Sequence, residues 1–293
     1  MTQIAPRDLA LLVTINLIWG FNLIASKVGV EHFPPVLFVT LRFALLALIL
    51  LPFLRWHAGG MQRLLVASAL SGGLQFALLF IGLDLSAGVS QVAIATQLGV
   101  PFTTLLSVML LGEVIRWRRW LGITLAFAGV VVIGFQPGLL ENRAGLLLVV
   151  ASTLVGSLGL VAVKSLGTQL RPLELQAWSA WTGLPVLVGL TLMLESGQWE
   201  AVRTAGALEW SALLYTTLGA SLVSHTAFYW LVARYPVTSI APLTVLSPIF
   251  GVAFGVLLLG DQLTPRILLG GLLTLTGVVI IAYREKRLVD TGS

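Results

Sequence analysis

The chain has 293 residues, of which 57% are hydrophobic and 10% are charged. Because a soluble domain carries about 25% charged residues, and because the mean hydropathy here is +0.99, the composition excludes a soluble globular protein and indicates an integral membrane protein. The chain has no cysteines, which excludes disulfides and thiolate metal sites, and its net charge of +5 comes from basic residues between apolar runs, where they act as topology signals and do not indicate nucleic-acid binding.

Ten stretches are long and apolar enough to cross a bilayer core of about 30 Å, which takes about 20 residues per helix. The connections between them are short and leave no room for a soluble domain. The first run is expected to be a retained helix and not a signal peptide. In chain order the predicted spans are 8–27, 34–54, 64–84, 89–110, 117–135, 144–163, 172–194, 208–231, 237–259 and 265–283. The sequence therefore predicts an all-α membrane protein with ten transmembrane helices.

The two halves of the chain repeat each other. A shift of 148 residues places glycine and charged positions of the first half on those of the second: Gly112-Glu113 on Gly260-Asp261, Arg118 on Arg266, Gly122 on Gly270 and Gly129 on Gly277. Five spans per repeat is an odd number, so the second copy must enter the membrane upside down. We predict two inverted five-helix repeats, 1–140 and 141–293, around a central cavity.

The basic residues predict the orientation, because cytoplasmic loops of membrane proteins are enriched in Lys and Arg. With the N-terminus in the cytoplasm, twelve fall inside: Arg7, Arg55, Arg63, Arg116, Arg118, Arg119, Lys164, Arg171, Arg234, Arg284, Lys286 and Arg287. Four fall outside: Lys27, Arg143, Arg203 and Arg266. Both termini are therefore expected in the cytoplasm.

Two prolines lie in the middle of apolar spans, one in each half. Pro101 and Pro248 each lack a backbone donor and clash with the carbonyl four residues earlier, which belongs to Gln97 or Thr244. Broken backbone is tolerated at membrane depth where it is buried in protein or lines a wet cavity. Paired breaks in two halves of one chain are typical of a transporter's central site. We expect gating or hinge roles for Gly99, Pro101, Pro248 and Gly251.

Polar side chains deep in a membrane helix face protein or water, and here they form stripes on several spans. Amide, hydroxyl and aromatic walls suit a zwitterion with a flat or apolar side chain. The expected substrate-binding residues are Trp19, Asn22, Gln75, Phe76, Gln97, Trp178, Ser224, His225, Tyr229 and Thr244. Structural alternatives remain: a helix-to-helix bridge for Gln75, a satisfied core histidine for His225 and a membrane-interface anchor for Trp178.

Arg42 is a charge within a span. It lies roughly 12 Å from the outer end of its helix at about 1.5 Å per residue. A permanent charge there costs at least about 2.5 kcal/mol unless it snorkels or finds partners. Arg42 either guides a carboxylate along the outer path or bonds helix-end carbonyls, with the structural role slightly favoured.

Several motifs together resemble the drug/metabolite transporter superfamily, and within it the EamA-type metabolite exporters. They are Trp19-Gly20 with Lys27, Pro34-Pro35 before Leu41-Arg42-Phe43, the Gly-Glu and Gly-Asp turns at 112–113 and 260–261, and the Gly-Val-Val segments at 129–131 and 277–279. The similarity covers the whole chain and looks nearest to bacterial aromatic amino acid exporters. It implies a basket of helices around a cavity in the bacterial inner membrane, export of amino acids or similar metabolites from the cytoplasm, and no ATP-binding domain.

Other functions fit less well. An intramembrane enzyme lacks the necessary groups: there is no cysteine, no G-x-S-x-G or H-E-x-x-H motif, and only one histidine within a span. We therefore expect no catalytic residues, metal or cofactor. A channel is a remote alternative, because the polar residues cluster at mid-depth. Export of purines or drug-like cations, and proton antiport through His225, remain open. The expected partners are a small-molecule substrate and the lipid bilayer, without nucleic acid; a monomer is slightly favoured over an oligomer.

Overall fold

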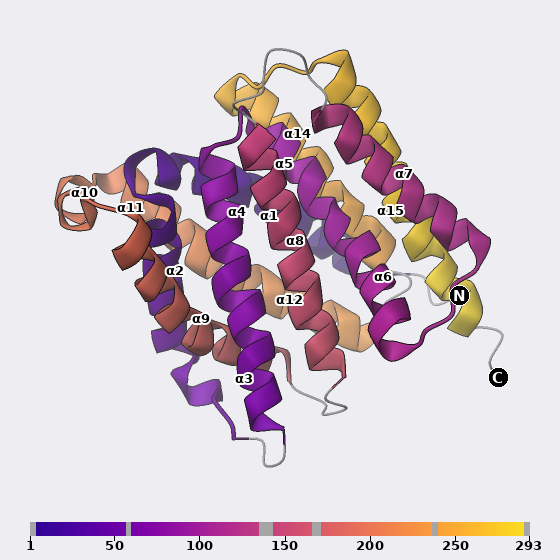
Figure 1. Ribbon diagram of the computed structural model, residues 1–293, viewed down its shortest axis with the longest axis horizontal. Coiled ribbons are helices and arrows are strands. Elements are labelled where there is room, and N and C mark those ends of the chain that lie inside the picture. The colour runs from indigo at the N-terminus through magenta and orange to yellow at the C-terminus, as the bar shows by residue number, and fades with distance from the viewer. Residues whose placement is uncertain (1–3, 57–59, 135–142, 166–170, 236–239, 290–293) are drawn as a thin grey trace.

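The computed structural model describes residues 4–56, 60–134, 143–165, 171–235 and 240–289, and every regular element among them is a helix (Figure 1). The first half contains α1 (Pro6–His32), α2 (Pro35–Leu50), η1 (Leu51–Phe53), α3 (Met61–Ala69), η2 (Leu70–Leu74), α4 (Gln75–Asp84), α5 (Val89–Ala95), η3 (Thr96–Leu98), α6 (Gly99–Leu111) and α7 (Trp117–Gly134). The second half contains α8 (Arg143–Lys164), α9 (Pro172–Leu194), α10 (Gln198–Thr204), α11 (Ala207–Leu214), η4 (Tyr215–Val223), α12 (Ser224–Arg234), η5 (Ala241–Val245), α14 (Leu246–Leu259) and α15 (Pro265–Val289).

Each predicted span is helical over the residues that the structure describes. Within the described ranges, eight helices are long and apolar enough to cross a membrane, and a shorter apolar helix covers Leu243–Leu259. The predicted span 208–231 is present as α11, η4 and α12 in succession. The all-α membrane fold is therefore confirmed, and the main differences in boundaries are α1, which continues to His32, and α15, which continues to Val289.

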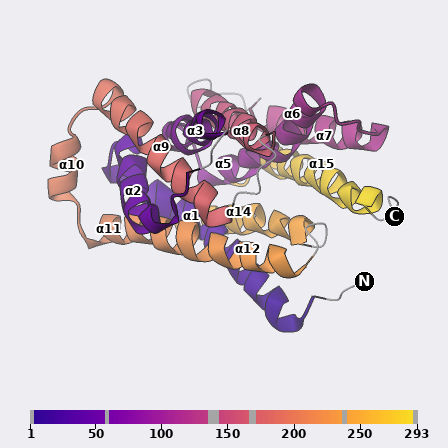
Figure 2. The ribbon, with the colours of Figure 1, turned by 90° about the horizontal axis from the view of Figure 1, so that it is seen from below.

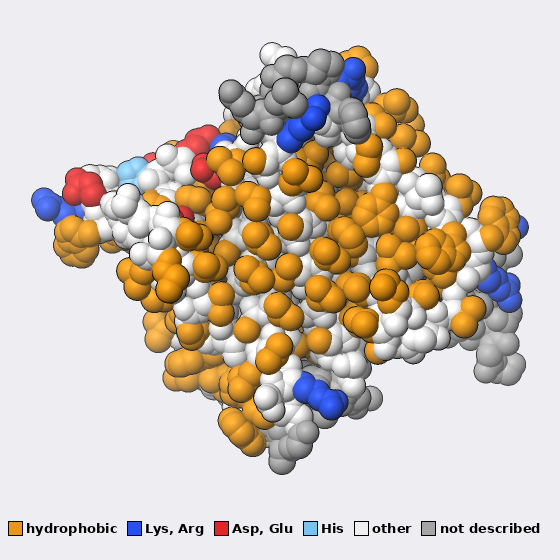
Figure 3. All heavy atoms as spheres, in the orientation of Figure 1, with side chains coloured by type: hydrophobic (Ala, Val, Ile, Leu, Met, Phe, Trp, Pro, Cys, Tyr) orange, Lys and Arg blue, Asp and Glu red, His pale blue; other side chains and the backbone are white. Residues whose placement is uncertain are grey.

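The outer surface is apolar where a bilayer would cover it. In Figure 3 hydrophobic side chains spread over the middle of the molecule, while Lys and Arg side chains lie toward its margins. Met109, Leu192 and Leu257 are 76%, 71% and 77% exposed. A surface of this kind is stable in lipid and would aggregate in water.

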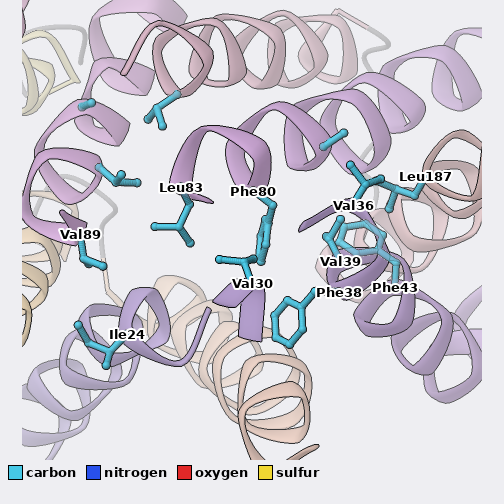
Figure 4. Packing of buried hydrophobic residues seen from close by; sticks show 14 of the residues in the cluster. Ile24, Val30, Val36, Phe38, Val39, Phe43, Phe80, Leu83, Val89 and Leu187 are labelled. Atoms are coloured by element: carbon cyan, nitrogen blue, oxygen red, sulfur yellow. The ribbon is translucent and has the colours of Figure 1, made fainter. Parts of the chain in front are cut away.

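The ends of the molecule differ in packing, and we name them by the turns they carry. The α14–α15 end lies at the top of Figure 1 and the α6–α7 end at the lower right. Near the α14–α15 end, α1, α2 and α4 bury a cluster of aromatic rings (Figure 4), with Phe38 5.9 Å from Phe33 and 5.8 Å from Phe80 between ring centroids. This half of the bundle is solidly packed.

The turns that end α6 and α14 have the same geometry. Gly112 and Gly260 both adopt left-handed φ values, 68° and 71°, where a side chain would be strained. Their N–H groups bond the carbonyls of Ser107 and Gly255, which are equivalent under the shift of 148 residues. The repeated sequence therefore folds into a repeated structure.

The last helices of the two repeats, α7 and α15, lie side by side in both ribbon views (Figures 1 and 2). A Cβ on Gly122 would meet the carbonyl of Gly277 at 2.8 Å, and one on Gly129 would meet the carbonyl of Gly270. From Gly122 to Gly129 the residue number increases along α7, while the number of the facing residue on α15 decreases from 277 to 270. The two helices are therefore antiparallel. Under the repeat shift, Gly277 is the equivalent of Gly129, and Gly270 is the equivalent of Gly122. Each glycine of α7 therefore faces the equivalent of the other, as a two-fold axis between the repeats requires. The second repeat is therefore inverted.

Equivalent segments of the two repeats also depart from α-helical geometry. The π-helical segments η2 and η4 precede Gln75 and Ser224, which are one residue apart under the repeat shift. The 3-10 segments η3 and η5 precede the prolines: Pro101 is the third residue of α6 and Pro248 the third of α14. π-helical turns are frequent at functional sites, and these two flank the cavity described below.

The two repeats are tied together at the α14–α15 end. One carboxylate oxygen of Asp261, just after α14, accepts hydrogen bonds from the Ser90 N–H at 2.7 Å and the Ser90 hydroxyl at 2.6 Å. Asp261 thereby caps α5, whose own N-cap residue, Gly88, has no side chain. A Cβ at Gly88 would lie 2.8 Å from Asp261, so glycine makes room for the carboxylate. We call this contact the Asp261–Ser90 latch.

Candidate functional site

A cavity of about 820 Å³ occupies the other half of the bundle. Toward the α6–α7 end its wall includes Glu113, Arg119 and Ala282, which lie just after α6, in the first turn of α7 and about two turns before the end of α15. At mid-depth its wall includes Arg42 and Gln75. The aromatic cluster near the α14–α15 end lies beyond it, so the cavity leads from the α6–α7 end to the middle of the molecule and stops against packed side chains.

Arg42 is the buried charge of the cavity wall, only 5% exposed. Its Nη2 donates to the Ser221 hydroxyl at 2.6 Å, and its guanidinium lies 5.5 Å from the centroid of the Phe76 ring and 6.0 Å from that of Phe80. Cation–π contacts of a desolvated guanidinium contribute about 2 kcal/mol. Arg42 therefore has partners on α4 and η4 and does not snorkel to a helix end.

The π-helical segment η4 sets the position of the polar groups opposite Arg42. The Ser221 hydroxyl donates to the Thr216 carbonyl at 3.0 Å, and the Nδ1 atom of His225 lies 2.8 Å from the Ala220 carbonyl. Both contacts span five residues, which is the spacing of a π-turn. Since a carbonyl only accepts, Nδ1 of His225 carries the proton in this contact. Ser221 and His225 both line the cavity.

Five of the predicted binding residues, one hinge residue and the predicted charge come together in the cavity wall. They are Gln75, Phe76, Gln97, His225 and Thr244, with Gly99 and Arg42. The Gln75 amide lies against α8 at Gly156, where a Cβ would collide with it. Gly99 has open space around its Cβ position, and its carbonyl accepts a hydrogen bond from the Ser157 hydroxyl at 3.1 Å. The start of α6, directly after η3, is thus bonded to α8 at mid-depth.

The stripe on α1 lies behind the cavity wall and not in it. The Trp19 ring packs against His225 and Phe228, with centroids 5.2 Å apart in each case. The indole nitrogen of Trp19 and the side-chain oxygen of Asn22 are buried without a hydrogen-bond partner among the described residues. Trp19 therefore supports His225 from behind, and Asn22 does not reach the lining.

Two further predicted residues are directed elsewhere. The Trp178 indole donates to the Arg55 carbonyl at 3.1 Å, at the exposed start of α9, which matches the interface-anchor alternative. The Ser224 hydroxyl donates to the Ala220 carbonyl of its own helix at 2.5 Å and is fully buried. The side chain of Tyr229 lies outside what the structure describes.

The remaining hinge candidates are buried in helix contacts beside the cavity. Pro101 and Pro248 are both buried. Gly251 lies where α14 meets α1: a Cβ on Gly20 would lie 2.9 Å from the Gly251 N–H nitrogen, and a Cβ on Gly251 would lie 3.2 Å from the Cβ of Ala93. Close packing is therefore a sufficient reason for glycine at 251.

Several lining residues were not predicted. Gln176, in the second turn of α9, lines the cavity. A polar stripe on α8 also lines it and was readable from its spacing: Ser152, Thr153, Gly156 and Ser157.

Comparison with known proteins places this architecture. The model of the EamA-like transporter family matches twice, over residues 8–135 and 143–283. A "Probable amino-acid metabolite efflux pump" of Escherichia coli (strain K12) is 28% identical over 97% of this chain and 98% of its own length. A protein of the same name from Salmonella typhimurium is 30% identical over 95% and 96%.

A solved crystal structure shares the fold, with a TM-score of 0.60 and 19% identity over 96% of this chain and 98% of that one. The two family matches fall on the two halves that the inverted packing relates, and together they cover most of the chain. The chain is therefore a member of the EamA-like transporter family.

Proposed function

We propose that this protein is a secondary transporter that exports amino acids, aromatic and other neutral ones, or similar small metabolites by alternating access. The cavity carries the proposal: it reaches mid-depth from one end, and it combines one buried cation with amide, hydroxyl and aromatic walls. A midplane site at the interface of inverted repeats, open to one side, is what alternating access requires. The printed names of the two enteric relatives support the same substrate class.

The bias of basic residues gives the proposed orientation. Arg55, Arg63, Arg116 and Arg171 all border the α6–α7 end. We therefore place that end and both termini in the cytoplasm of a bacterium, with the protein in the inner membrane. In this orientation the cavity is open to the cytoplasm and the latch closes the outer side. The repeats 1–140 and 141–293 would then rock about η3 and η5, with hinges at Gly99, Pro101, Pro248 and Gly251.

The residues proposed to contact substrate are those of the wall at mid-depth: Arg42, Gln75, Phe76, Gln97, His225 and Thr244. The buried charge of Arg42 disfavours drug-like cations as substrates. No acidic residue offsets it at mid-depth, because the only acidic residue among the described lining residues, Glu113, lies at the α6–α7 end. The same absence of a mid-depth carboxylate leaves His225 as the proposed carrier if protons are exchanged. We favour export down the substrate gradient.

The test is counterflow in liposomes that contain the purified protein. Vesicles are preloaded with unlabelled aromatic amino acid, neutral aliphatic amino acid, purine or a quaternary ammonium compound, and entry of the labelled counterpart is followed. We expect exchange of aromatic amino acids and none of the cation. Exchange of purine with no exchange of any amino acid would overturn the proposal.

A further inference from the structure

Ser221 organises two side chains from two other helices. Its hydroxyl accepts the bond from Arg42 of α2, and its backbone carbonyl accepts a hydrogen bond from Nε2 of Gln176 at 2.8 Å. The Ser221 hydroxyl gives its own proton to the Thr216 carbonyl, so it can only accept from Arg42. Arg42, Gln176 and Ser221 all line the cavity, and both anchoring atoms belong to one residue. The two side chains are therefore held next to each other.

The same bonds fix which polar atoms remain for a ligand. A backbone carbonyl accepts and cannot donate, so the amide of Gln176 must present its NH₂ group to Ser221 and its oxygen elsewhere. That oxygen, Oε1, is shielded from water and has no partner among the described residues. Nε of Arg42 is likewise a shielded donor without a described partner. Buried polar groups without hydrogen bonds are unfavourable. A ligand that donates to Oε1 of Gln176 and accepts from Arg42 is therefore bound more tightly.

We propose that Arg42 and Gln176, both anchored on Ser221, form the subsite for the α-amino-acid head group, with Arg42 binding the carboxylate and Oε1 of Gln176 accepting from the ammonium. The inference rests on the proposed function and adds how the zwitterion is recognised. Carboxylate is the natural partner of a guanidinium. An amide oxygen accepts from an ammonium without bringing a second charge into the membrane. The Phe76 ring, against which Arg42 lies, is then placed for the substrate's side chain.

Three probes separate the two halves of the head group in the liposome assay. Phenylalanine carries both charges, 3-phenylpropionate lacks the ammonium, and phenethylamine lacks the carboxylate. Each is measured as a competitor of labelled phenylalanine. In the unchanged protein we expect phenylalanine to compete better than either analogue.

The decisive variant is Gln176→Leu. We expect the apparent affinity for phenylalanine to fall about tenfold, the worth of one hydrogen bond to a charged group, while competition by 3-phenylpropionate stays within about twofold. Arg42→Gln should weaken both compounds by about 10- to 100-fold, and it should not weaken phenethylamine, a cation that Arg42 disfavours. Gln62 and Arg63, both exposed on α3, give the matched controls Gln62→Leu and Arg63→Gln, which should change none of the three.

Equal weakening of phenylalanine and 3-phenylpropionate by Gln176→Leu, or no weakening, would overturn the assignment. If that variant does not fold, Gln176→Met decides, because it keeps the length of the side chain but has no amide oxygen: phenylalanine competition should weaken while 3-phenylpropionate stays within about twofold, and equal weakening of the two refutes the subsite. Failure of the unchanged protein to exchange any amino acid is a separate result, which refutes the proposed function itself.

Discussion

Breaking the Asp261–Ser90 latch should release the end of the molecule that is closed. In Asp261→Ala, α5 loses two charge-assisted hydrogen bonds of 2.7 and 2.6 Å. Hydrogen bonds to charged groups contribute about 1.5–3 kcal/mol each when buried, and loss of a helix cap costs about 0.5–2 kcal/mol. Because Asp261 is partly exposed and water replaces some of the loss, we take about 2 kcal/mol, which shifts the balance toward the open form about 30-fold.

The assay uses the absence of native cysteine. Gly99→Cys introduces a thiol in the cavity wall at a position with open space for a side chain. In liposomes of known orientation, a membrane-impermeant maleimide applied from the Asp261 side should react slowly with this protein. It should react up to about 30-fold faster after Asp261→Ala, because the population open to that side rises.

The matched control is Glu209→Ala. Glu209 also caps a helix near the α14–α15 end, through a 2.8 Å bond from the Gly206 N–H, but that bond is local to α11. It should leave the labelling rate unchanged. Equal rates with and without Asp261, or the same acceleration from Glu209→Ala, would refute the latch as a tie between repeats.

Three further predictions follow from the packing. Gly129→Val should destabilise the protein by about 1–3 kcal/mol, seen as a lower thermal transition in detergent, because its side chain would meet the backbone of α15, including the Thr274 N–H nitrogen at 2.6 Å; an unchanged transition would contradict the α7–α15 contact. Gly156→Ala should leave stability nearly unchanged but alter substrate affinity, because only the flexible end of Gln75 must move. A loss of stability as large as that of Gly129→Val would show instead that Gln75 is a structural bridge between helices. His225→Gln should leave the pH profile of exchange unchanged if transport follows the substrate gradient alone, and a flattened profile would assign His225 to proton exchange.

The spans and the inversion were predictable from the sequence because hydropathy and basic residues reflect the bilayer directly. Glycines at helical spacing indicate where helices approach closely in lipid, but the pairing of α7 with α15 comes from the structure. The cavity residues were less accessible to prediction. Stripes were assigned with a period of 3.6 residues, but η2 and η4 are π-helical, and their wider turns rotate the residues that follow. Ser224 was placed on the cavity face by the α-helical period, but its hydroxyl bonds the carbonyl four residues earlier in its own helix.

Gln176 shows a second reason why the site was only partly predictable. Its position near the start of α9 carries no signal of depth, and its role depends on the carbonyl of Ser221, 45 residues later in the chain. Arg42 was recognisable as an unusual charge, but its partners come from α4 and η4. Contacts of this kind depend on tertiary structure, which no local pattern contains.

The reciprocal pairing of Gly122 with Gly277 and of Gly129 with Gly270 has an evolutionary consequence. One five-helix unit carries both halves of this contact, so two identical copies in opposite orientations could form it twice over without any change of sequence. An ancestor of half this length could thus have worked as a pair inserted both ways up. Fusion into one chain then freed each copy to acquire its own side chains, and Arg42 and Gln176 now stand on opposite members of the former pair.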